Sequence, residues 1–254
     1  GGEDKTNCFN NDFWCYSADW LYIPTPIEPR AFHAAAWDGK DSVVICGGKS
    51  RDNEIFKDFY IVDTKTKLTR KLDFQLPFPL FYHTLTHTKD NNYCLCGGNT
   101  ENGMNTHVFM LKCQQQKVES FTVEKLQTEI HQSIFRYHIA SYLFDMLFVP
   151  VVPLENEQPQ IWCFNFDHRM WLPITTPGFP NPFFIFSSEA NFVNILSLDF
   201  RRILTIQLLD DSQRNDWKNN PLFVQVLGSK IVDATAFFDA TCSKISALPD
   251  CKTP

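Results

Sequence analysis

Three histidines stand at matching points of the chain and are the first residues to consider for metal or acid–base chemistry. His33, His83 and His138 each lie in a short apolar run that predicts a strand. Imidazole can ligate a metal or transfer a proton near neutral pH. Because the three share one position of a repeated pattern, we expect them to have a structural role. The other four are scattered along the chain: His87, His107, His131 and His168.

The pair Cys94 and Cys96 has the spacing of half a metal site. Residues two apart in a strand point to the same face of a sheet, so two adjacent thiols there are more simply explained by core packing. A metal site needs several converging ligands, and no close cluster of His, Cys and Asp supplies them. The sequence therefore predicts no metal site and no cofactor.

Catalytic sequence signatures are missing as well. The chain contains no Gly-X-Ser-X-Gly elbow and no phosphate loop ending in Gly-Lys-Ser/Thr. A catalytic triad is defined by geometry and not by spacing, but no set of residues can be assigned to one. We therefore expect a protein that is not an enzyme, with no catalytic residues.

Composition favours a β-sheet protein and excludes some partners. Of the 254 residues, 44% are hydrophobic and 15% are aromatic, with 24 Phe, which suits half-buried pleated surfaces. The net charge of −6 disfavours nucleic acid. No apolar run approaches the length of a membrane span, so we expect no membrane insertion. Nine Cys, most of them inside apparent strands, favour the cytoplasm or another reducing intracellular compartment.

A repeat organises these residues. Gly pairs occur at Gly1-Gly2, Gly47-Gly48 and Gly97-Gly98, at spacings of 46 and 50 residues. Before each of the last two pairs comes a strand-like run that contains the shared His, then a turn, then an apolar run that ends at the glycines. A polar loop and two more strand-like runs follow. One unit thus predicts four strands, with the polar loop between its second and third strands.

The same order continues with weaker marks. A third unit is predicted from Arg136 to Ala140 and from Met146 to Val149, with Pro150 where the glycines would stand. A fourth begins near Phe184, and its outer strand is expected near Trp217. The segment from Ile231 to Leu248 contains two strand-like runs, and the N-terminus supplies only two outer ones. We expect these two ends of the chain to share one closing sheet.

Stacked radially, such four-stranded sheets bury both of their apolar faces. The sequence therefore predicts an all-β protein whose residues 1–254 form a single β-propeller domain. About five blades are expected, with six as the alternative. Closure by strands from both termini would leave no exposed sheet edge.

The units resemble the kelch repeat, in which an apolar strand ending in Gly-Gly is followed by an aromatic strand, Asp and a downstream Trp. The best match runs from Arg30 to Leu72. The unit from Phe81 to about Leu126 and the start of the chain up to Ile23 also match, and the three segments together make up about half the chain. The third and fourth units lack the glycines, and Leu68 and Phe121 stand near the usual Trp. The resemblance implies a kelch-type propeller that binds a partner protein, for recruitment or as a scaffold.

By this resemblance the partner would bind a face built from loops. Acidic residues outnumber basic ones in these loops, which favours a partner with basic residues. The candidate partner-binding residues are Glu3, Asp4, Lys5, Lys49, Arg51, Asp52, Glu54, Asn99, Glu101, Glu155 and Glu157.

Two other functions stay open. The chain is alternatively a structural subunit embedded permanently in a large multi-protein complex, with the apolar connector from Phe179 to Phe184 as an interface. The third alternative is an enzyme similar to galactose oxidase. That enzyme needs Tyr and His copper ligands and a Tyr–Cys crosslink, and no such set can be assigned in this sequence.

Overall fold

The computed structural model describes residues 2–3, 8–16, 19–113, 121–126, 139–151, 160–167, 169–175, 182–186, 192–197, 202–208 and 224–231. Within these ranges the elements are β-strands, apart from one short 3-10 turn at Lys89–Asn91. All strand pairs are antiparallel. The predicted all-β class is confirmed.

Two successive sheets are built as the repeat predicts. The first contains β5 (Ala34–Trp37), β6 (Ser42–Cys46), β7 (Asp58–Asp63) and β8 (Thr69–Gln75), in that order. The second contains β9 (Phe81–His87), β10 (Tyr93–Thr100), β12 (Val108–Cys113) and β13 (Phe121–Leu126), and the short β11 (Gly103–Met104) pairs with the end of β10.

A third four-stranded sheet contains β14 (Ser141–Leu143), β15 (Met146–Val151), β16 (Gln160–Asn165) and β17 (Met170–Thr175). Its first strand was expected at Arg136–Ala140. That expectation is wrong where the structure describes it, because Ile139 and Ala140 precede the strand. The cause is a two-residue turn in which Phe144 and Asp145 both have positive φ, of 52° and 59°. Such a turn pairs Leu143 with Met146 and so fixes the strand at 141–143.

The fourth sheet contains β18 (Pro182–Phe186), β19 (Phe192–Ser197), β20 (Arg202–Leu208) and β21 (Val224–Ile231). Its outer strand was expected near Trp217, and this placement is wrong. The repeat spacing put the strand too early, whereas β20 pairs with Val224–Ile231, from Leu208↔Val224 to Arg202↔Ile231. Ile231 therefore ends this sheet and does not begin the next one.

The N-terminal residues form two small sheets. Strands β3 (Phe13–Tyr16) and β4 (Trp20–Ile23) pair with each other, which confirms the two outer runs predicted there. The short β1 (Gly2–Glu3) and β2 (Phe9–Asn10) form the other pair. The runs expected to complete β3 and β4, in residues 232–248, lie outside the described residues, so the shared closing sheet stays a prediction.

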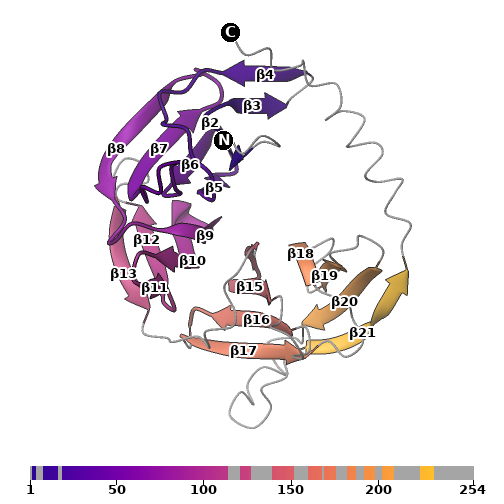
Figure 1. Cartoon of the computed structure of the whole chain (residues 1–254). Helices are drawn as coiled ribbons and strands as arrows, with labels where there is room; N and C mark the ends of the chain where they lie inside the picture. Colours follow the sequence, from indigo (N-terminus) through magenta and orange to yellow (C-terminus); the bar gives the residue numbers. More distant parts are fainter. Residues whose placement is uncertain are drawn as a thin grey trace.

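Figure 1 shows the sheets following one another along an arc, with the last strand of each full sheet (β8, β13, β17 and β21) on the outside. Apolar side chains fill the space between neighbours. Leu85 and Leu95 of the second sheet join Val44 and Phe59 of the first. On its other face the second sheet presents Cys94 and Cys96 to Leu147 and Phe164 of the third. A further core cluster joins the third and fourth sheets.

No helix in the described ranges is long and apolar enough to cross a membrane.

Candidate binding face

The two Gly pairs have positive φ angles at the same end of successive sheets. Gly48 and Gly98 have φ angles of 96° and 90°. A Cβ on Gly48 would stand 2.8 Å from the Cβ of His33 and 2.9 Å from the carbonyl oxygen of Ala31. A Cβ on Gly98 would stand 2.7 Å from the Cβ of His83. Only glycine fits this backbone conformation and this close approach. The loops that follow both pairs therefore leave the sheets at one common edge.

Each loop is short and internally bonded. In the first, the backbone N–H of Ser50 donates to the carbonyl of Glu54 at 2.8 Å, and the N–H of Glu54 donates to Oγ of Ser50 at 3.1 Å. In the second, Asn99 pairs with Met104 in a small hairpin, and the N–H of Asn105 donates to the carbonyl of Gly98 at 2.8 Å. Loops bonded in this way present their side chains in a defined geometry.

The predicted partner-binding residues divide into three groups. The exposed ones are Glu3, Arg51, Asp52, Glu54 and Glu101, and the half-buried ones are Lys49 and Asn99. The others, Asp4, Lys5, Glu155 and Glu157, lie outside the described residues. Among the ion pairs of the described ranges, none involves Arg51, Asp52, Glu54 or Glu101. These charged side chains are therefore available to a partner.

The connector formed by residues 76–82 lies between the two loops. The N–H of Gly48 donates to the carbonyl of Leu80 at 2.8 Å, which ties the connector to the first loop. Lys49 places its Nζ 5.4 Å from the centre of the Phe81 ring. On the other side, Phe78 lines a pocket together with Glu101 of the second loop. The structure thus joins both loops through the connector.

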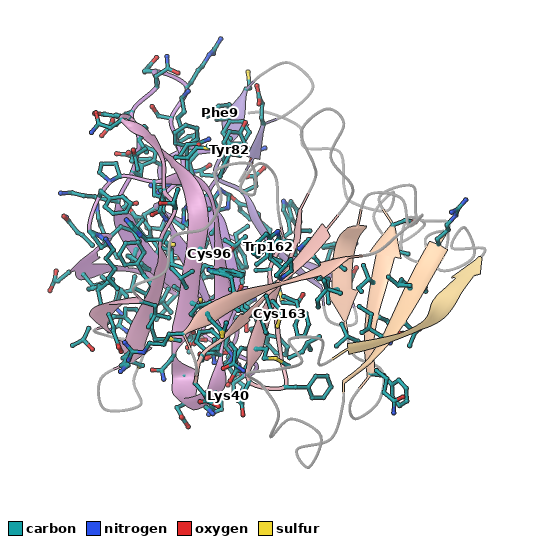
Figure 2. All side chains as sticks on the ribbon, turned by 90° about the horizontal axis from the view of Figure 1, so that it is seen from below. Phe9, Lys40, Tyr82, Cys96, Trp162 and Cys163 are labelled. Atoms are coloured by element: carbon teal, nitrogen blue, oxygen red, sulfur yellow. The ribbon has the colours of Figure 1, made fainter. Side chains whose placement is uncertain are left out.

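An aromatic row that was not predicted from the sequence lies on this face and is formed by Phe9, Phe32, Tyr82 and Phe81. Its ring centroids are 6.1 Å apart for Phe9 and Phe32, 4.2 Å for Phe32 and Tyr82, and 5.3 Å for Tyr82 and Phe81. All four side chains are half-buried. In Figure 2, Phe9 and Tyr82 lie toward one edge of the molecule and Lys40 lies at the opposite edge.

Two members of the aromatic row have unusual backbones. Phe32 and Tyr82 have φ angles of 59° and 57°, which is rare and costly for a bulky residue. The N–H of Tyr82 donates to the carbonyl of Phe32 at 2.9 Å and thereby links the two sheets. The matching triplets around His33 and His83 contain these residues, so the repeat was the available signal. The positive φ has no signature in the sequence.

A buried ion pair between Arg30 and Asp58 lies next to Gly47, just before the first loop. The guanidinium of Arg30, 1% exposed, donates to both carboxylate oxygens of Asp58, at 2.6 and 3.2 Å, and to the carbonyl of Gly47 at 2.9 Å. Its Cζ lies 4.1 Å from the centre of the Phe56 ring. Lys71 adds a second, longer contact to Asp58 at 3.6 Å. The Arg30–Asp58 pair was not predicted, because its two residues are far apart in the sequence.

Of the three histidines of the repeat, His33 and His83 are described, and both have structural surroundings. Nε2 of His83 lies 3.3 Å from Sγ of Cys46. Burial raises the pKa of this thiol, so the pair is no thiolate–imidazolium nucleophile. His33 lines a cavity of about 250 Å³ with Asp12 and Trp14. Burial above all, together with the charge of Arg30, lowers the pKa of His33 to about 4, so its ring is neutral at pH 7.

The remaining residues considered for chemistry do not converge in the described part of the chain. No group of three or more His, Cys, Asp or Glu side chains there is placed to hold a metal ion. Cys94 and Cys96 are fully buried in the core, and burial raises the pKa of both thiols. His138, His131 and His168 lie outside the described residues.

The loops at 49–54 and 99–105, the connector at 76–82 and the aromatic row together form what we call the Gly-pair face. Comparison of the sequence with known protein families finds no match, and comparison with characterised proteins finds no similar chain. What can be said of function therefore comes from the surface chemistry of this face.

Proposed function

We propose that this protein is a non-catalytic interaction module that binds a partner protein through the Gly-pair face. The observation that carries the proposal is the combination on one edge of a half-exposed aromatic row and two loops whose charged side chains have no ion-pair partner in the described ranges. Aromatic residues dominate the centres of protein interfaces, and charged rims set specificity. The strained backbones of Phe32 and Tyr82 fit a surface selected for binding.

We further propose that the scaffold is a kelch-like β-propeller. The repeated Gly pairs, the constant strand order of the sheets and their arrangement along an arc support this architecture. A propeller would hold loops from successive sheets on one rigid rim, which lowers the entropy lost when a partner binds. Recruitment and scaffolding are the roles that such a rim suits.

A charge reversal on each edge of the molecule tests the binding proposal. Asp52→Lys reverses an exposed acidic charge in the first loop of the Gly-pair face, and Lys40→Glu reverses an exposed charge on the opposite edge. Tagged wild type and both variants are purified from native cells, and co-purified proteins are quantified by mass spectrometry. We expect Asp52→Lys to reduce recovery of the main partner about tenfold or more, because the new positive charge repels the basic residues that the acidic loops favour in a partner. Lys40→Glu should leave the recovery unchanged.

Other outcomes are informative. Equal recovery with all three proteins would contradict binding through the Gly-pair face. Loss of the partner only with Lys40→Glu would place the interface on the opposite edge. A thermal unfolding curve for each variant, measured beside the wild type, separates lost binding from lost folding.

A further inference from the structure

Residues of the first and second sheets can be matched one to one near the Gly pairs. Cys46 pairs with Phe59 in the first sheet, and Cys96 pairs with Val108 in the second. The N–H of Phe56 donates to the carbonyl of Gly48 at 2.9 Å, and that of Asn105 donates to the carbonyl of Gly98 at 2.8 Å. It follows that His107 stands where the first sheet has Asp58, and that Asn105 stands where it has Phe56. By the matched triplets, Leu80 stands at the position of Arg30.

In the first sheet the position that matches Leu80 is occupied by the guanidinium of Arg30. Arg30 is bound there by a carboxylate (Asp58), a glycine carbonyl (Gly47) and an aromatic ring (Phe56). A planar guanidinium suits this combination, because it can donate to oxygen atoms at its edge while its face covers a ring. The first sheet therefore shows that this backbone arrangement can bind a guanidinium group.

In the second sheet no arginine of the chain stands at the matching position. Asn105 donates from Nδ2 to the carbonyl of Gly97 at 2.8 Å and replaces the bond that Arg30 makes to Gly47. Leu80 is fully buried and has no polar group to offer. Nδ1 of His107 is buried, and within the described part of the chain it has no hydrogen-bond partner. A buried polar atom of this kind requires a partner or costs free energy.

His107 lines a pocket of about 320 Å³ between the connector and the second loop. Its wall includes the side chains of Phe78, Glu101 and Met104, and Met104 is 38% exposed. Glu101 is the one acidic residue among the lining residues, and no lysine or arginine lines the pocket. The pocket volume lies at the lower end for ligand sites, which suits a single side chain.

We propose that this pocket binds an arginine side chain presented by the partner protein. The carboxylate of Glu101 would accept from the guanidinium, and the Phe78 ring would cover its face. The arrangement repeats, between two proteins, the chemistry that Arg30 shows within the first sheet. The arginine site deepens the proposed function and rests on it, since the side chain comes from the bound partner.

The pocket can be tested without the partner, because Met104 reports on it. The chain has four methionines, and Met104 is the one that lines this pocket. Methyl-labelled methionine gives one NMR signal per residue, so Met110, Met146 and Met170 serve as internal controls. The probe is N-acetyl-arginine N-methylamide, and its neutral counterpart is N-acetyl-citrulline N-methylamide. We expect a saturable shift of the Met104 methyl with the arginine probe only, at a millimolar dissociation constant.

Two matched variants assign the charge contact. Glu101→Gln should weaken arginine binding about fivefold, as expected for a partly screened ion pair. Asp73→Asn removes an exposed carboxylate of β8, outside the Gly-pair face, and should leave binding unchanged. Unshifted methyl signals of Met110 and Met146 in both variants confirm that the fold is retained.

Equal shifts with arginine and citrulline would overturn the proposal, as would a Met104 shift no larger than that of exposed Met170. Partner recovery from cells distinguishes this failure from failure of the proposed function. If Asp52→Lys abolishes recovery while the pocket ignores arginine, the Gly-pair face binds the partner by other contacts. If the pocket binds arginine but no partner depends on this face, the proposed function fails.

Discussion

The connector before the first strand of a sheet carries Arg30 before β5 and Leu80 before β9. Both connectors nevertheless continue into the same backbone conformation. Each is followed by an aromatic residue with positive φ, Phe32 or Tyr82, and each lies against a Gly pair. The first sheet fixes this arrangement with a buried ion pair, and the second with a buried leucine and the Asn105 amide. The glycines and the strand register therefore define the backbone, while the side chains that stabilise it can differ.

The first strands of the two sheets, β5 and β9, also differ in what covers them. His83 and Leu85 of β9 are 5% and 6% exposed, because they face the first sheet. At the matching positions of β5, Ala35 is exposed, and Trp37, which matches His87, is 58% exposed. In the described ranges only the outer pair β3 and β4 stands beside that side of the first sheet. The comparison shows how much burial a complete neighbouring sheet supplies.

The largest expected effect comes from making the first sheet resemble the second at its connector. Arg30→Leu leaves the Asp58 carboxylate buried, with only the longer contact to Lys71. We expect a loss of about 3–5 kcal/mol in the free energy of unfolding, as when one member of a buried pair is removed. Chemical denaturation measures it. The double variant Arg30→Leu with Asp58→Asn should recover part of the loss, and a loss below about 1 kcal/mol in the single variant would refute a stabilising pair.

Next in size is the substitution of a Gly-pair glycine. Gly48→Ala places a Cβ within 3 Å of His33 and Ala31 at a φ of 96°, so we expect a loss of about 2–4 kcal/mol. Gly39→Ala is the matched control, because Gly39 also has a positive φ, of 79°, but has open space around it. The control should lose only about 1 kcal/mol, as a positive φ alone costs. Equal losses in the two variants, measured by denaturation, would show that the close approach does not matter.

A pH dependence should follow from the cavity beside His33. Burial lowers the pKa of His33 from 6.5 to about 4, so between these values the unfolded chain takes up a proton that the folded chain does not. Stability that is complete above pH 6.5 should therefore fall as the pH decreases toward 4, by up to about 3 kcal/mol. His33→Gln should flatten this part of the profile. An unchanged slope in the variant would assign the dependence to other groups.

The smallest expected effect concerns the exposed side of β5. Trp37 donates from Nε1 to the carbonyl of Lys40 at 3.1 Å, an exposed bond of small value. Trp37→Ser should change the free energy of unfolding by less than about 0.5 kcal/mol, as surface substitutions do. A loss of about 2 kcal/mol or more would show instead that another part of the chain covers this side of the sheet, as the predicted closing sheet would.

Much of the fold could be predicted from local patterns. The apolar runs that end at Gly47 and Gly97 predicted β6 and β10. The turn-rich segments before these runs indicated the preceding strands, β5 and β9. Where the glycines were missing, prediction was less accurate. The turn at Phe144–Asp145 contains no glycine, although both residues have positive φ, so the start of β14 was placed too early. The longer connection after Leu208 moved the outer strand of the fourth sheet from Trp217 to Val224–Ile231.

The candidate site was predicted in part. The loops after the glycines were found because polar residues follow each pair. The aromatic row and the Arg30–Asp58 pair were not found, because both depend on contacts between residues far apart in the sequence. Phe32 and Tyr82 have positive φ next to the residues that approach the glycines, and side-chain types alone do not encode this conformation. The kelch resemblance and the closing sheet stay predictions.

Binding through the Gly-pair face can be tested most directly by hydrogen exchange of the chain alone and with its co-purified main partner. We expect the partner to slow exchange in residues 49–55, 78–82 and 99–105, with no change in the turns at 38–41 and 64–68 of the opposite edge. Slower exchange confined to those turns, or no change at any of these residues, would contradict binding through the Gly-pair face.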